Sequence, residues 1–189
     1  VTSLATAPNN DGGFTITGMI QKEGAFGPQT HKTPDTPYLT SLASDGTFQW
    51  TKVFKGEGER LIYGFERTDS GGLYLLGYAN QPILLPGETK SIVGQGFVAK
   101  LDEKGKVLWW RGEQHWLTNA KVRHVRIAVG QDDRLYVVAL VSEADTNAPI
   151  QSRGGTDLLV YQFSKEGKRE KVFSIGGAGE EKVTSVTVG

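Results

Sequence analysis

The sequence predicts an all-β fold built from repeated four-stranded antiparallel sheets. Three observations lead to this prediction. Turn residues recur with a period of about sixty residues, short β-branched and aromatic segments lie between the turns, and no window of ten or more residues has the apolar spacing of a helix. We therefore expect strands throughout the chain and almost no helix.

Two turn markers define the period. A Gly-Gly turn that ends at Gly13 returns at Gly72, and the third copy carries Asp133-Arg134 instead. The glycine of the second marker stands at Gly46, Gly105 and Gly167. Glycine supplies the positive φ that tight hairpins need, so each marker is expected to join two antiparallel strands.

Each period is predicted to hold four strands in the same order. The first strands are expected near 1–5, 60–63 and 122–125, the second at 14–17, 73–76 and 135–138, the third at 38–42, 96–101 and 157–163, and the fourth at 48–54, 107–111 and 170–175. Residues 183–188 repeat the pattern of the opening strand and predict a thirteenth. The repeats then cover 1–59, 60–121 and 122–182, with the first strand of a further repeat at 183–189, in a single domain over residues 1–189.

Four short antiparallel strands per period, with glycine at the turns, are typical of a β-propeller blade. The clearest copy runs from Arg60 to Trp109 and combines a Ser-Gly-Gly turn, a strand ending at Gly77, a long polar loop and a Lys-Gly turn before Trp109. In this combination the chain resembles the bacterial SBBP-type propeller repeats. The resemblance implies an extracellular or cell-surface bacterial protein. The Lys-Gly-Lys-Val-Leu-Trp turn is also similar to quinoprotein-type repeats, in which a Gly and then a Trp dock neighbouring blades.

The repeat count affects how the fold can close. Three blades and one extra strand fall short of the four to eight blades of ordinary propellers. We therefore expect either a piece of a longer array or a ring completed by association of copies through open blade edges.

The tryptophans divide into two classes. Trp50 and Trp109 occupy the same repeat position, and packing between blades is the favoured interpretation of both. Trp110, His115 and Trp116 have no counterparts in the other copies and form an aromatic and basic segment. Such a segment suits stacking on a sugar polymer if it is exposed, whereas burial under a loop is the favoured alternative.

Candidate metal and catalytic motifs are sparse in the sequence. Glu143, Asp145 and Asn147 alternate oxygen ligands as a calcium loop does, but they lack the turn glycine and the distal glutamate, which favours a solvated loop. We find no zinc-ligand spacing, no Gly-x-Ser-x-Gly nucleophile and no phosphate-binding glycine loop. We therefore predict no catalytic residue, no cofactor and no metal in this chain.

Composition limits the classes of partner. The chain has 21 basic and 21 acidic residues, no cysteine, and no apolar stretch long enough to span a membrane as a helix. Nucleic acid and membrane insertion are therefore not expected, and a protein, a second copy or a surface polysaccharide is. The sequence predicts a non-catalytic binding or structural module, such as a filament or adhesin component. The alternative is a piece of a propeller lyase, glycosidase or quinone-type dehydrogenase whose catalytic residues lie outside these residues.

Overall fold

The chain folds into antiparallel β-sheets, as predicted. The structure is a computed structural model that describes residues 2–26, 29–32, 34–89, 91, 96–113, 125–142 and 148–188. Within these ranges no α-helix occurs, and one 3-10 turn lies at Gln131–Asp133. The contacts divide the chain into two compact units, Val1–Gly112 and Glu113–Gly189. The prediction of a single domain and the propeller arrangement stay predictions.

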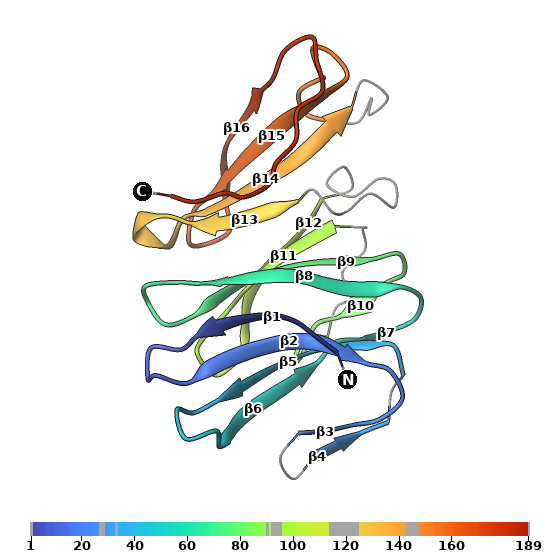
Figure 1. Cartoon of the computed structure of the whole chain (residues 1–189), viewed down its shortest axis with the longest axis vertical. Helices are drawn as coiled ribbons and strands as arrows, with labels where there is room; N and C mark the ends of the chain where they lie inside the picture. The colour runs from blue at the N-terminus through green and yellow to red at the C-terminus, as the bar shows by residue number, and fades with distance from the viewer. Residues whose placement is uncertain are drawn as a thin grey trace. The chain divides into compact units, whose positions relative to one another are not determined.

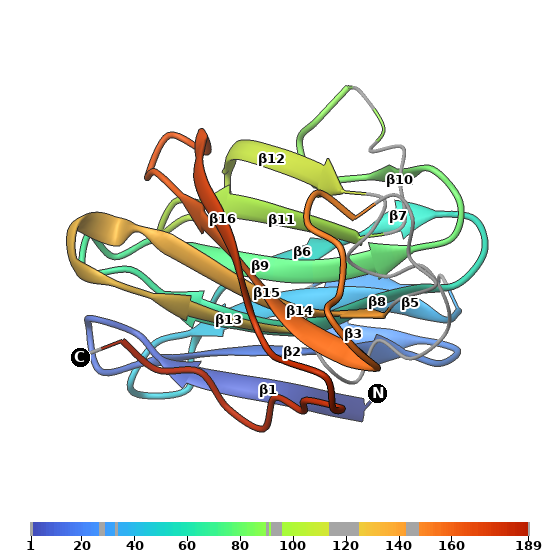
Figure 2. The same cartoon turned by 90° about the horizontal axis from the view of Figure 1, so that it is seen from above.

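The first unit contains two four-stranded sheets (Figure 1). The first sheet has the order β1-β2-β5-β6 and consists of β1 (Thr2–Pro8), β2 (Phe14–Ile20), β5 (Thr36–Leu42) and β6 (Phe48–Val53). The second has the order β12-β11-β9-β8, visible in Figure 2, and consists of β8 (Arg60–Arg67), β9 (Leu73–Ala79), β11 (Gly96–Leu101) and β12 (Val107–Glu113). Both sheets therefore follow chain order from one edge to the other.

The second unit contains the third sheet, in the order β13-β14-β15-β16. Its strands are β13 (Arg126–Val129), β14 (Leu135–Ser142), β15 (Thr156–Phe163) and β16 (Arg169–Ile175). All three sheets lie within the predicted repeats 1–59, 60–121 and 122–182. Of the first strand expected at 122–125, only Val125 lies in the described residues, and β13 begins at Arg126.

The long connections between second and third strands carry short strands of their own. β3 (Gly24–Phe26) and β4 (Gln29–His31) form a hairpin in the first sheet's connection. In the second, β10 (Ile83–Leu84) pairs with β7 (Lys55–Gly56), which leads from the first sheet to the second.

The turn markers form the same hydrogen bonds in each copy. At the second marker, Ala43, Asp102 and Ser164 each donate their N–H to the carbonyl four residues later, and the glycines have φ of 83°, 71° and 79°. At the first marker, Asp133 takes a φ of 56° where Gly12 has 80° and Gly71 has 89°. The third copy therefore keeps the turn without its glycines, because aspartate tolerates this conformation better than most residues.

The predicted thirteenth strand is not a strand in the structure. Residues 181–188 belong to no sheet; Glu181 N–H donates to the Thr156 carbonyl at 2.8 Å. Val183 is buried against Val138 of β14 and Val160 of β15. The segment therefore packs on the face of its own sheet. The same alternation of apolar residues predicts a strand and allows this packing, so the sequence pattern does not distinguish the two.

The main core of the first unit lies between its two sheets. Leu39 and Phe54 contribute to it from the first sheet and its exit, and buried side chains of the second sheet complete it, among them Phe65, Leu75, Phe97 and Val107. A smaller cluster of Ile20, Phe26 and Tyr38 fixes the β3–β4 hairpin, with the Phe26 and Tyr38 rings 4.5 Å apart. The main core packs the two sheets together, and the smaller cluster packs the β3–β4 connection against the first sheet.

Candidate functional site

A polar cleft lies at the turn end of the first two sheets. Its volume is about 680 Å³, and we name it the turn-end cleft. A second cleft, described below, has a volume of about 420 Å³. The lining of the turn-end cleft includes Asn9, Asp11 and Gln49 from the first sheet and Arg67, Glu103 and Lys104 from the second. Acidic, basic and amide side chains from both sheets therefore line one concave surface.

An ordered hydrogen-bond network forms the first-sheet side of this cleft. Asn9 Nδ2 donates to Ser41 Oγ at 3.0 Å, and Thr15 Oγ1 donates to Asn9 Oδ1 at 2.8 Å. Ser41 Oγ donates to Gln49 Oε1 at 2.7 Å, and Gln49 Nε2 donates to Asp11 Oδ2 at 2.7 Å. The network crosses three strands and holds the amides in fixed orientations.

Asp11 is ionised more easily than an ordinary aspartate. Its carboxylate accepts the Gly13 N–H at 3.0 Å and the amide of Gln49. These two hydrogen bonds lower the pKa of Asp11, with the Gly13 N–H the larger cause. The cleft therefore holds a negative charge near its rim at neutral pH.

Arg67 reaches from β8 into the network of the first sheet. Its Nη2 donates to Asn9 Oδ1 and Thr15 Oγ1, and its Nη1 donates to the Gly71 carbonyl at 2.9 Å. Burial lowers the pKa of the guanidinium, and the nearby Asp11 opposes this shift. Arg67 thus fastens the second sheet to the first at the turn end.

Trp50 makes a second contact between the same sheets. Its Nε1 donates to the Glu103 carbonyl at 2.9 Å, and the half-buried ring packs against the core of the second sheet. A Cβ at Gly105 would lie 2.8 Å from Lys52 Cε and 3.0 Å from the Trp50 ring, so both side chains pack against the glycine turn. Trp50 therefore lies between the two sheets of the first unit, and its role in packing between propeller blades stays a prediction.

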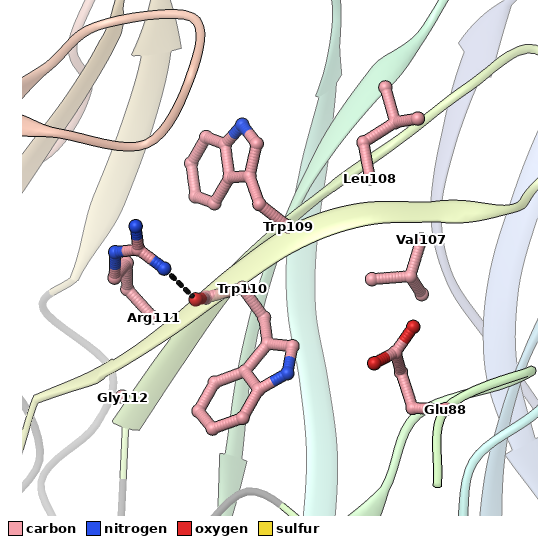
Figure 3. Close-up of a pocket in the computed structure, with 7 residues that line it drawn as sticks. All are labelled: Glu88, Val107, Leu108, Trp109, Trp110, Arg111 and Gly112. Carbon is pink, nitrogen blue, oxygen red and sulfur yellow. Dashed lines mark hydrogen bonds between the residues drawn. The ribbon is translucent and has the colours of Figure 1, made fainter. Parts of the chain in front are cut away.

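A smaller cleft lies along the edge strand β12, and we name it the Trp110 cleft. It is lined by Glu88 and by 107–112 of the strand (Figure 3). Figure 3 shows Trp109 on one side of the strand and Trp110 on the other, with Glu88 on the Trp110 side. Arg111 Nη1 donates to the Trp110 carbonyl at 2.7 Å.

The two tryptophans of this strand have different surroundings. Trp110 is half-buried and packs against the core between the first two sheets. Trp109 lies 5.6 Å from the Tyr74 ring and 5.9 Å from the Arg111 guanidinium, measured between centres. Trp110 is therefore partly a core residue, while its exposed part lines the cleft. Burial of the whole aromatic segment under a loop stays a prediction.

Several predicted candidates lie outside the described residues. These are His115 and Trp116 of the aromatic segment, and Glu143, Asp145 and Asn147 of the calcium hypothesis. In the part of the chain that the structure describes, no group of three or more His, Asp or Glu side chains is placed to hold a metal. Within the same part, no helix is long and apolar enough to cross a membrane.

The glycines predicted as structural occupy constrained positions. A Cβ at Gly13 would lie 2.1 Å from the Leu42 carbonyl oxygen, and one at Gly72 would lie 2.5 Å from that of Leu101. Gly46, Gly105 and Gly167 have positive φ. The first pair is needed for close approach and the second group for conformation.

No protein-family model and no curated protein sequence matches this chain. The resemblance to SBBP-type repeats therefore rests on the turn and strand markers alone.

Sequence reasoning missed the two arginines that join the sheets. Arg67 and Arg60 stand at the two ends of β8, and neither has an arginine at the same position of the other copies. The only signal was a basic residue at each end of a mainly apolar strand, which is weak because most such residues are solvated.

Proposed function

We propose that this chain is a non-catalytic binding and structural module whose repeated sheets associate side by side with like sheets. The observation that carries the proposal is the contact of Trp50 with the Gly105 turn. It joins two copies of one sheet design through residues that are themselves part of the repeat. A blade-type array, as in a β-propeller, is the arrangement to which such a contact belongs.

The exposed surfaces of the first unit support an assembly role. β1 and β6 are the edge strands of the first sheet, and Phe14 and Phe48 are large exposed apolar side chains on it. Open strand edges and exposed aromatic rings favour association with another sheet. The proposed partners are therefore a second copy or a related repeat protein.

The connections at the other end of the strands offer a second contact surface. They hold the β3–β4 hairpin and the β10–β7 pair, which differ between the two sheets. Binding on repeat scaffolds commonly uses such variable connections. An extracellular or cell-surface bacterial setting belongs to the same proposal and is supported by the repeat resemblance.

Sedimentation velocity on the intact chain tests the assembly role. We expect the weight-average mass to rise reversibly as concentration is raised over about a hundredfold range, because association follows mass action. A mass that stays at the monomer value over the whole range contradicts an assembly role.

A further inference from the structure

One face of the first sheet is exposed at positions where the corresponding face of the second sheet is buried. Phe14 is 39% exposed and its counterpart Leu73 is 0% exposed, while Phe48 is 40% exposed and its counterpart Val107 is 7% exposed. Leu73 and Val107 belong to the core against which Trp50 packs. What buries these positions in the second sheet is therefore its contact with the first.

The turn glycines show the same difference. Gly105 and Gly46 have similar φ, 71° and 83°, and each donates its N–H to the carbonyl three residues earlier, at 3.0 and 2.9 Å. A Cβ at Gly105 would meet the Trp50 ring, whereas one at Gly46 would meet no atom within 4 Å. Gly46 therefore has the turn geometry of Gly105, but in the part of the chain that the structure describes no tryptophan ring packs against it.

The geometry points to one occupant for this face: another four-stranded sheet of the same repeat type, whose fourth-strand tryptophan rests on Gly46. That tryptophan would stand at the position that Trp50 and Trp109 hold in their repeats. Its indole N–H would meet the carbonyl of Ser44, which stands where Glu103 accepts the Trp50 N–H. The inference deepens the proposed function and rests on it, since it names the face and the class of partner.

One feature of the known contact would be missing at this second one. Pro8 stands at the position of Arg67, so the first sheet has no arginine to reach into the turn of the incoming sheet. The docking free energy must come from burial of exposed apolar side chains, Phe14 among them, and from the tryptophan on the turn. The tryptophan is therefore the residue to test.

The test adds a second copy of residues 1–59 ahead of the intact chain, in repeat phase. The chain has no cysteine, so a single introduced thiol reports the accessibility of its own position. Phe48→Cys in the original repeat should react readily in the native chain, and Val107→Cys should be protected as Val107 is buried. In the extended chain we expect the Phe48→Cys thiol to react at least about tenfold more slowly, because a packed interface must open before it reacts.

Two matched variants make this result specific. Trp50→Ala in the added copy alone should restore fast labelling, and Leu84→Cys, exposed at the other end of the strands, should react equally in both chains. Equal labelling of Phe48→Cys in both chains overturns the inference. So does an added copy that gains no strand signal in far-UV circular dichroism, because the first sheet would then have failed to dock it.

This outcome is separate from that of the sedimentation experiment. A chain that self-associates but leaves Phe48→Cys reactive in the extended form keeps the assembly role and loses the docking face. A monomeric chain whose extended form protects Phe48→Cys keeps the docking face and loses self-association.

Discussion

At the scale of single residues, two kinds of glycine shape the sheets. Some leave room for a neighbouring atom, as Gly72 does for the Leu101 carbonyl oxygen. Others, such as Gly64 in β8, have ordinary φ and no atom within 4 Å of a Cβ. The sequence marks the first kind only through its recurrence with the turn, so recurrence is the better guide to constraint than glycine content.

These two glycines predict opposite results for the same substitution. Gly72→Ala should lower the free energy of unfolding by about 2–3 kcal/mol, because the methyl group overlaps a backbone oxygen. Gly64→Ala should leave it unchanged or raise it by about 0.4–1 kcal/mol, since alanine restricts the unfolded chain. Urea unfolding followed by tryptophan fluorescence measures both, and equal losses would contradict the role assigned to Gly72.

The candidate-site residues were predictable to different degrees. Trp50 could be assigned to packing because its position recurs as Trp109 beside a glycine turn. The network around Asn9 and Gln49 could not, because several of its hydrogen bonds join residues more than 30 positions apart, and those of Arg67 depend on how two sheets meet. Polar contacts of that kind leave no periodic pattern in the sequence.

At the scale of elements, β8 fastens the first two sheets at both of its ends. Arg67 acts at the turn end, and Arg60 acts at the end of the connections. Arg60 is buried; its guanidinium donates to the Phe54 carbonyl at 3.2 Å, to the Gly58 carbonyl at 2.7 Å and to Thr36 Oγ1 at 2.8 Å. Burial lowers the pKa of Arg60, and the charge of Asp35 opposes this. β8 is therefore joined to the first sheet by an arginine at each of its ends.

Replacing Arg60 tests this role. Arg60→Met should destabilise the chain by about 2–3 kcal/mol, because three acceptors lose a charged donor while the aliphatic packing is kept. Arg60→Lys should recover only part of the loss, since one ammonium group cannot reproduce the planar set of donors. Guanidinium unfolding measures both, with the exposed Lys55→Met as control; equal stability of the three variants would show that the hydrogen bonds of Arg60 contribute little.

Strands were more predictable than the pieces between them. Eleven of the twelve strands of the three sheets overlap the ranges expected from turn chemistry and two-residue alternation, which are local properties, and the range expected for the other, 122–125, lies mostly outside the described residues. The β10–β7 pair was not predicted, because β7 has only the two residues Lys55 and Gly56 and its pairing depends on the buried Ile83 of a distant connection. Such short pairs are fixed by packing and not by propensity.

At the scale of the whole molecule, the last residues stabilise the third sheet without extending it. Val183 is buried on β14 and β15, and the Thr184 carbonyl accepts a hydrogen bond from Arg126 Nε at 3.4 Å. The sequence predicted a strand here because residues 183–186 repeat the opening pattern. A strand also needs an unpaired edge within reach, and this requirement cannot be read from a local pattern.

Substitutions in this segment separate the two interpretations. Val183→Ser should lower the free energy of unfolding by about 1–2 kcal/mol, because a buried apolar side chain is lost. Val188→Ser, at an exposed position, should change it by less than about 0.5 kcal/mol. Thermal unfolding by circular dichroism makes the comparison, and a neutral Val183→Ser would mean that the segment does not stabilise the sheet.

The contact of Trp50 with the Gly105 turn has a direction. The tryptophan belongs to the earlier sheet and the glycine to the later one, so the two sides of the joint are different surfaces. Copies joined through such a contact are related head to tail, and they continue until they close into a ring or extend as a filament. An isolated pair with twofold symmetry, in which both partners use the same surface, is not an arrangement that this joint can make.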